Sequence, residues 1–106
     1  MLNESFFVSE KVIEKEVTLS DGTSHKLYFK ELPALEFRKF YIAEQSKDED
    51  VQDAAMAKLV AASLCEPDGK PAITVKKALK LNGSALTAIF EAIIQVNGFG
   101  VDAKKD

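Results

Sequence analysis

KVIEKEVTLSDGTSHKLYFKE, residues 11–31, alternates apolar and polar side chains along both of its halves. This alternation is typical of half-buried β-strands. Between the halves, Ser20-Asp21-Gly22-Thr23 supplies a turn, because Asp and Gly tolerate the positive φ angles of a tight reversal. The segment therefore predicts a β-hairpin with one apolar face, interrupted by Lys15. That face consists of Ile13, Val17, Leu19, Leu27 and Phe29.

A two-stranded hairpin is only marginally stable in water, so its apolar face needs a partner. The rest of the chain predicts helices that can supply one. Each predicted helix has a residue suited to a helix start, either a proline without an N–H to lose or a side chain that can cap. The predicted helices are 34–45 after Pro33, 46–65 opened by a Ser46/Glu49 capping box, 75–81 after Thr74, and 85–97 between Ser84 and Gly98.

These elements predict an α+β protein in which an N-terminal β-hairpin packs on a mainly α-helical body of about four helices. The length of 106 residues fits one domain. We expect an N-terminal segment at 1–10, the hairpin at 11–31, the helical body at 33–98 and a flexible tail at 99–106.

The fourth predicted helix has more apolar surface than an ordinary surface helix. Thr87, Glu91 and Gln95 form one narrow polar stripe, and the other sides are apolar. This helix is either central to the domain or partly an intermolecular surface, or both. The first helix carries Leu35 and Ile42 on one side and an aromatic group on the other. The predicted protein interface consists of Phe37, Phe40, Tyr41, Leu86, Ile89, Phe90 and Ile93.

Composition restricts the class of protein. A hydrophobic content of 46% is too high for a disordered chain, and a net charge of −3 argues against general nucleic-acid binding. The single cysteine, Cys65, cannot form an intrachain disulfide, and residues 1–8 lack the basic start of a signal peptide. No apolar run reaches the length of about 18 residues that a membrane span needs. We therefore expect a soluble intracellular protein.

Chemistry-bearing motifs are missing from the sequence. One histidine, His25, and one cysteine, forty positions apart, do not make a metal site or a local nucleophile–base motif. We expect no catalytic residues, no metal and no cofactor.

Residues 74–94 could form a DNA-binding helix-turn-helix, but residues 82–98 contain no Lys or Arg to contact phosphates or bases.

Several features in their order along the chain resemble the tail assembly chaperones of long-tailed bacteriophages, in particular the lambda-like siphophages. The resemblance covers about residues 6–100 and concerns overall layout and two loop phrases. It depends on a Phe-rich start, VTLSDG at 17–22, LPALEF at 32–37, the alanine-rich helix leading into LCEPDGKP at 64–71, and residues 86–98 before a lysine-bearing tail.

The resemblance implies a protein that self-associates and coats the helical tape measure protein in the host cytoplasm, without entering the mature virion. It also implies a longer form, made by ribosomal frameshifting, that recruits the tail tube protein; this chain resembles the short form, and codons 103–105 could hold the slippery site. The alternatives are another head–tail morphogenesis protein, such as a connector or tube component, a DNA-binding regulator, or a small enzyme that uses Cys65.

Overall fold

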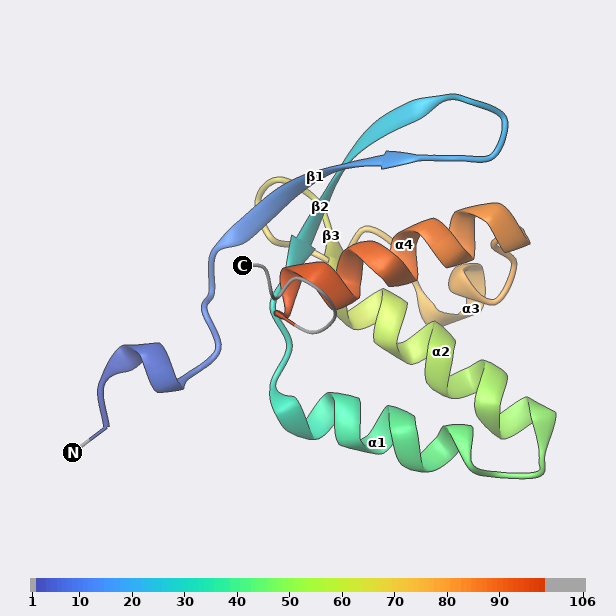
Figure 1. Cartoon of the computed structure of the whole chain (residues 1–106), viewed down its shortest axis with the longest axis horizontal. Helices are drawn as coiled ribbons and strands as arrows, with labels where there is room; N and C mark the ends of the chain where they lie inside the picture. The colour runs from blue at the N-terminus through green and yellow to red at the C-terminus, as the bar shows by residue number, and fades with distance from the viewer. Residues whose placement is uncertain (1, 99–106) are drawn as a thin grey trace.

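The computed structural model describes residues 2–98. The predicted α+β class is confirmed: a three-stranded antiparallel sheet packs against four α-helices (Figure 1). The predicted tail at 99–106 and the codons at 103–105 lie outside the described residues. In chain order the elements are the 3₁₀ turn η1 (Glu4–Phe6), β1 (Val12–Thr18), β2 (Ser24–Lys30), α1 (Ala34–Glu44), α2 (Glu49–Ser63), β3 (Leu64–Cys65), α3 (Val75–Ala78) and α4 (Gly83–Val96).

The hairpin forms as predicted. Ile13 lies opposite Phe29, and Val17 lies opposite His25, so the apolar residues of both strands share one face. Phe29 is fully buried and Val17 is 4% exposed. At the turn, Gly22 has a φ of 89°, in the left-handed region that favours glycine. The Oδ1 of Asp21 accepts hydrogen bonds from the hydroxyl and the backbone N–H of Thr23, and these bonds lower the pKa of the Asp21 carboxyl.

A third strand was not predicted. The second helix ends at Ser63 and not near Cys65, and the next two residues pair with β2, Tyr28 opposite Cys65 and Phe29 opposite Leu64. The buried hydroxyl of Ser63 donates to the carbonyl oxygen of Lys30 at 2.8 Å, where β2 ends. This contact to a distant part of the chain holds the end of α2 against the sheet. Two residues are too few to show strand periodicity in the sequence.

Three further helix boundaries differ from the prediction. Asp48, not Ser46, caps α2, by accepting from the N–H of Asp50. Asn82, not Ser84, caps α4, by accepting from the N–H of Ala85. Both positions show a competition between neighbouring residues that are equally good caps. Thr74 does cap α3, although that helix ends at Ala78 and is shorter than predicted.

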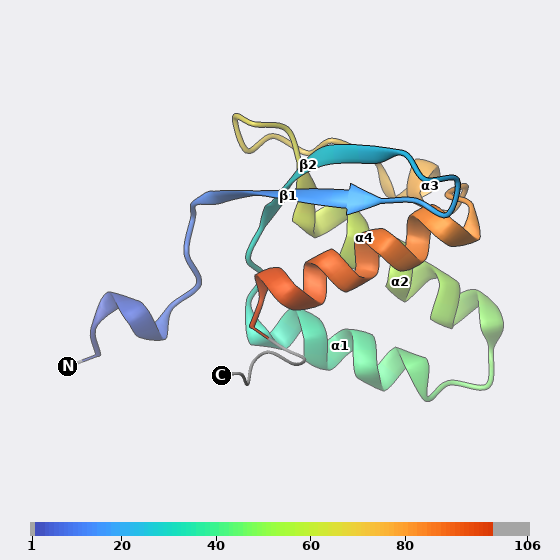
Figure 2. The same cartoon turned by 45° about the horizontal axis from the view of Figure 1, so that its top comes forward.

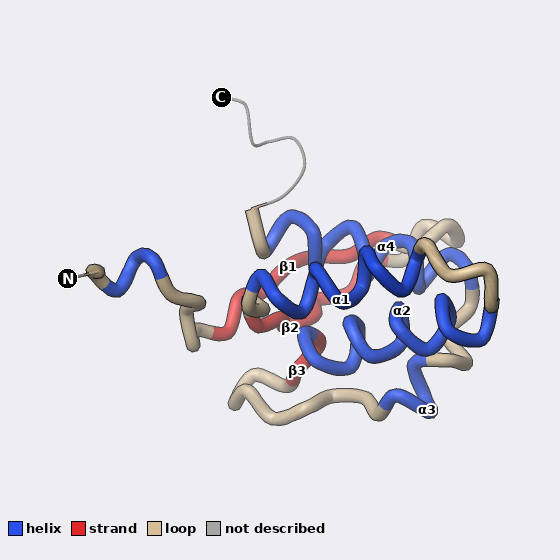
Figure 3. The backbone as a smooth tube through the Cα atoms, turned by 90° about the horizontal axis from the view of Figure 1, so that it is seen from below, coloured by secondary structure: helices blue, strands red, loops and turns tan. Residues whose placement is uncertain are grey.

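The helices lie in layers on one side of the sheet, and α4 is the helix that covers it most. Helix α4 packs on β1 and β2, α2 packs on α1, α3 and α4, and α1 is the outermost helix (Figures 2 and 3). Both ends of α4 are hydrogen-bonded to the hairpin region. The Ser84 hydroxyl accepts from the N–H of Ser20, and the Asn97 side chain accepts from the N–H of Leu32. Of the two roles considered for α4, the structure therefore gives it the central one.

Candidate functional site

The seven predicted interface residues do not form one surface. Those that are almost completely buried are Phe37, Phe40, Ile89 and Ile93, and each is at most 5% exposed. Leu86 and Phe90 are partly buried against the same core. Only Tyr41, at 47%, is substantially exposed. The structure does bring the aromatic groups of α1 and α4 together, but as internal packing: the Phe40 and Phe90 ring centroids are 5.5 Å apart.

The exposed apolar side chains of α1 lie on its other side. Leu35 is 67% exposed and Ile42 is 58% exposed, one above the other on the helix surface. The aromatic side of α1, which the sequence predicts as the interface, therefore lies largely in the core, with Tyr41 as its exposed member. The aromatic side faces the core because large rings bury the most apolar area. The aliphatic side is left facing solvent.

A shallow groove runs beside this exposed surface, between α1 and α2. We call it the α1–α2 groove; it has a volume of about 300 Å³. Two alanines of α2, Ala54 and Ala55, contribute to its lining, and small residues of this kind leave room for another backbone. The remaining lining residues are Phe40, Ala43, Val51 and Leu59, with Glu36, Lys39 and Lys58 as the charged ones. The predominantly apolar lining suits a side chain or helix edge from a partner.

The second exposed apolar surface is the N-terminal arm, which we define as residues 2–10. It precedes the first residue of β1 and extends away from the helical body (Figures 1 and 2). Its large apolar side chains are Leu2, Phe6, Phe7 and Val8, between 38% and 70% exposed. Apolar side chains gathered on a surface in this way mark contact sites more often than isolated ones do.

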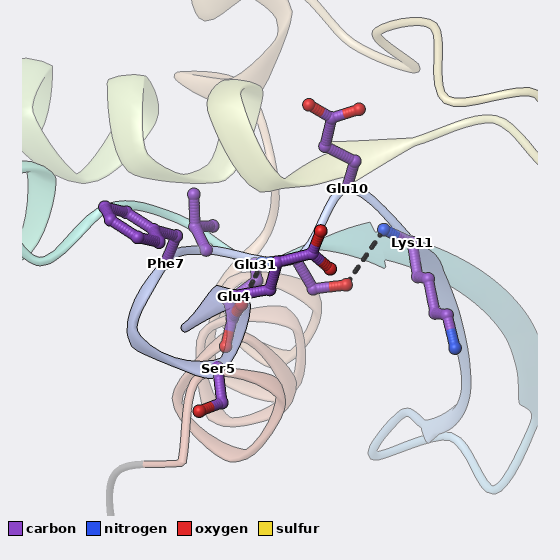
Figure 4. Close-up of a pocket in the computed structure, with 8 residues that line it drawn as sticks. Glu4, Ser5, Phe7, Glu10, Lys11 and Glu31 are labelled. Carbon is purple, nitrogen blue, oxygen red and sulfur yellow. Dashed lines mark hydrogen bonds between the residues drawn. The ribbon is translucent and has the colours of Figure 1, made fainter. Parts of the chain in front are cut away.

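The root of the arm is fixed by hydrogen bonds. The N–H of Ser9 donates to the Glu31 carboxylate, and the N–H of Lys11 donates to the Ser9 hydroxyl (Figure 4). Between arm and body lies an open hollow of about 900 Å³ that is lined by three carboxylates, those of Glu4, Glu10 and Glu31. Within residues 2–98 no group of three or more His, Cys, Asp or Glu side chains is placed to hold a metal ion.

The two residues considered for chemistry lie apart. The Nε2 of His25 is 2.9 Å from the Thr23 hydroxyl at the hairpin turn. Cys65, by contrast, is on β3, where it pairs with Tyr28 of β2. Cys65 is 3% exposed, and burial raises the pKa of its thiol, which disfavours the reactive thiolate. A nucleophile–base pair between them is not formed.

Helix α4 does not expose a face that could read DNA. Ile89 and Ile93 on this helix are in the core, and its exposed stripe consists of Thr87, Glu91 and Gln95. A recognition helix needs its reading face free to enter the major groove. Among the residues that the structure describes, none of the helices has the length and hydropathy to cross a bilayer.

Comparison with known protein families identifies the family of this chain. A model of the phage tail assembly chaperone family matches residues 1–97. The chain belongs to this family. A search of curated proteins and a search of solved structures each found no significant match. The arm, the sheet and the four helices all lie within the matched range.

Proposed function

We propose that this tail assembly chaperone self-associates and keeps the tape measure protein soluble until tail tube subunits polymerise around it. It acts in the cytoplasm of the infected bacterium, by binding and without catalysis, and is left out of the finished virion. The longer frameshifted form recruits the tail tube protein. Family membership supports the general role, and the exposed apolar surfaces support binding as its means.

The α1–α2 groove is the observation on which client binding rests. Val51 lines it and is 43% exposed. Leu35 and Ile42, 67% and 58% exposed, do not line it, but each directly precedes a residue of α1 that does, Glu36 and Ala43. A helical client can lay an apolar stripe, with residues at i, i+3, i+4 and i+7, into such a groove. Apolar contact is non-directional, so one groove can accept many segments of a long helical protein. Such tolerance suits a protein that coats a client along its length.

The test is co-expression with the tape measure protein of the same phage. In the Ile42→Asp/Val51→Asp variant two exposed apolar side chains become charged, and one of them, Val51, lines the groove. We expect client solubility and co-purification to fall at least roughly tenfold, because each buried apolar side chain contributes about 1.5–3 kcal/mol. The matched control, Thr87→Asp/Gln95→Asp, adds the same charge on the exposed stripe of α4 and should retain the client. Equal client retention by both variants, each shown to be folded by circular dichroism, would exclude the groove.

A further inference from the structure

We propose that the N-terminal arm of one copy docks on α3 and the preceding loop of the next copy, so that copies join head to tail. This inference rests on the self-association proposed above and names the two surfaces that form the contact. Every residue of the arm, from 2 to 10, is exposed. Its apolar side chains are therefore available to a partner without any change in the fold of the body.

The proposed acceptor is a second exposed apolar surface. Val75, at the start of α3, is 36% exposed, and Pro71 and Ala72 in the preceding loop are also exposed. Pro71 and Ala72 line a hollow of about 440 Å³ together with Ile73, Thr74 and Lys77. We call this region the α3 surface. A phenylalanine side chain such as Phe6 or Phe7 can bury about 150–250 Å² in a site of this kind.

Charge selects the α3 surface over the other hollows. The arm contains Glu4 and Glu10 and no Lys or Arg, whereas residues 69–90 contain no Asp or Glu and four lysines. These lysines are Lys70, Lys76, Lys77 and Lys80, and none forms an ion pair within residues 2–98. Opposite charge on two contacting surfaces speeds association and fixes their register.

The other hollows suit the acidic arm less well. The hollow between α2, α3 and α4 includes the exposed Leu79, but it is also lined by Glu44 and Asp53, whose carboxylates would repel the arm. In the α1–α2 groove, Lys39 is already paired with Glu36 at 3.7 Å. Of the four hollows named here, the one on the α3 surface is lined by a lysine, Lys77, and by no carboxylate.

The free edge of β1 is also a poor route to self-association. Two β1 strands that pair antiparallel with their apolar faces inward bring residues of equal parity together. The central registers then place Glu14 or Glu16 opposite another glutamate, and like charges directly opposite destabilise a strand pair.

The positions of the two surfaces give the direction of the assembly. The arm and α3 lie at opposite ends of the molecule in all three overall views (Figures 1, 2 and 3). A contact between different surfaces is heterologous, and its repetition produces a closed ring if the rotation closes or an open spiral if it does not. Each copy in such an array donates one arm and receives one.

Charge reversal tests the contact in trans. One variant carries Glu4→Lys/Glu10→Lys and the other carries Lys76→Glu/Lys77→Glu. We expect each alone to self-associate roughly tenfold or more weakly in sedimentation velocity, because its arm and its α3 surface then repel. An equimolar mixture should regain the assembly, since each arm meets an acceptor of opposite charge on the other variant. The control Arg38→Glu/Lys47→Glu has the same charge change as the α3 variant and should assemble like the wild type.

Two results would overturn the inference. If both charge variants assemble like the wild type, the contact lies elsewhere. If the mixture stays monomeric while a single chain carrying all four reversals behaves like the wild type, the arm docks on its own chain. Client co-purification with the wild type is measured in parallel, so a failure of the arm contact is distinguished from a failure of the chaperone function. A wild type that is monomeric at all concentrations would contradict self-association itself.

Discussion

Phe40 and Ile42 are close neighbours on α1, but truncation to alanine should destabilise the fold strongly at Phe40 and hardly at all at Ile42. Phe40 is 5% exposed, and its ring lies 5.5 Å from Phe90 and 5.4 Å from Tyr41, centroid to centroid. Replacing a core phenylalanine by alanine costs about 3–5 kcal/mol. The α1–α2 groove, about 300 Å³, lies beside Phe40, so water can reach the space left behind, which favours the lower part of that range. At about 4 °C per kcal/mol, Phe40→Ala should lower the melting temperature by about 12–16 °C.

Ile42→Ala is the matched variant, because Ile42 is 58% exposed on the same helix. Its free energy of unfolding should change by less than about 0.5 kcal/mol, as is usual for surface positions. Both variants are measured by thermal and urea unfolding, followed by circular dichroism, at several protein concentrations, because self-association makes apparent stability concentration-dependent. An Ile42→Ala variant as unstable as Phe40→Ala would refute the reasoning, since α1 would then bury its aliphatic side.

Two further predictions concern the third strand. Ser63→Ala should destabilise the protein by about 1–3 kcal/mol in urea unfolding, because it leaves the Lys30 carbonyl without the hydroxyl that donates to it. The control Ser24→Ala, in the exposed part of the hairpin, should lower the free energy of unfolding by less. The Cys65 thiol should react with Ellman's reagent much more slowly in the folded protein than in urea at pH 7–8, because burial raises its pKa. The same shift means that stability is complete below the thiol pKa of the unfolded chain, about 8.5, and declines as the pH rises above it. Rapid reaction of the native thiol at neutral pH would contradict its placement on β3.

The hairpin could be predicted from sequence because all of its determinants are local. Strand alternation and the Asp21-Gly22 turn act within a few residues. The third strand could not, because its two residues pair with a strand more than thirty positions earlier and depend on the Ser63–Lys30 hydrogen bond. The capping errors at Ser46 and Ser84 have another cause: Asp48 and Asn82, two positions away in each case, are equally good caps, and only packing chooses between them.

The candidate surfaces were harder to predict than the fold. The sequence showed that α1 has two apolar sides, but not which one the core would take, since Leu35 and Phe37 are both strongly apolar. The large apolar residues at the N-terminus contributed to the family resemblance, yet they show no periodicity that identifies them as an exposed arm. Exposure of Phe6 and Phe7 is a property of the tertiary structure and had no signal in the sequence.

The α1–α2 groove and the proposed arm–α3 contact have no residues in common, so a copy can join its neighbours and hold client at the same time. If copies join head to tail, the groove recurs at a regular interval along the array. A groove of about 300 Å³ makes only a weak contact by itself. A long helical client that occupies several grooves binds the later ones at an effective concentration fixed by the array, so that many weak contacts hold it collectively. Weak individual contacts are also easily released one after another, which the proposed transfer of the client to polymerising tube subunits requires.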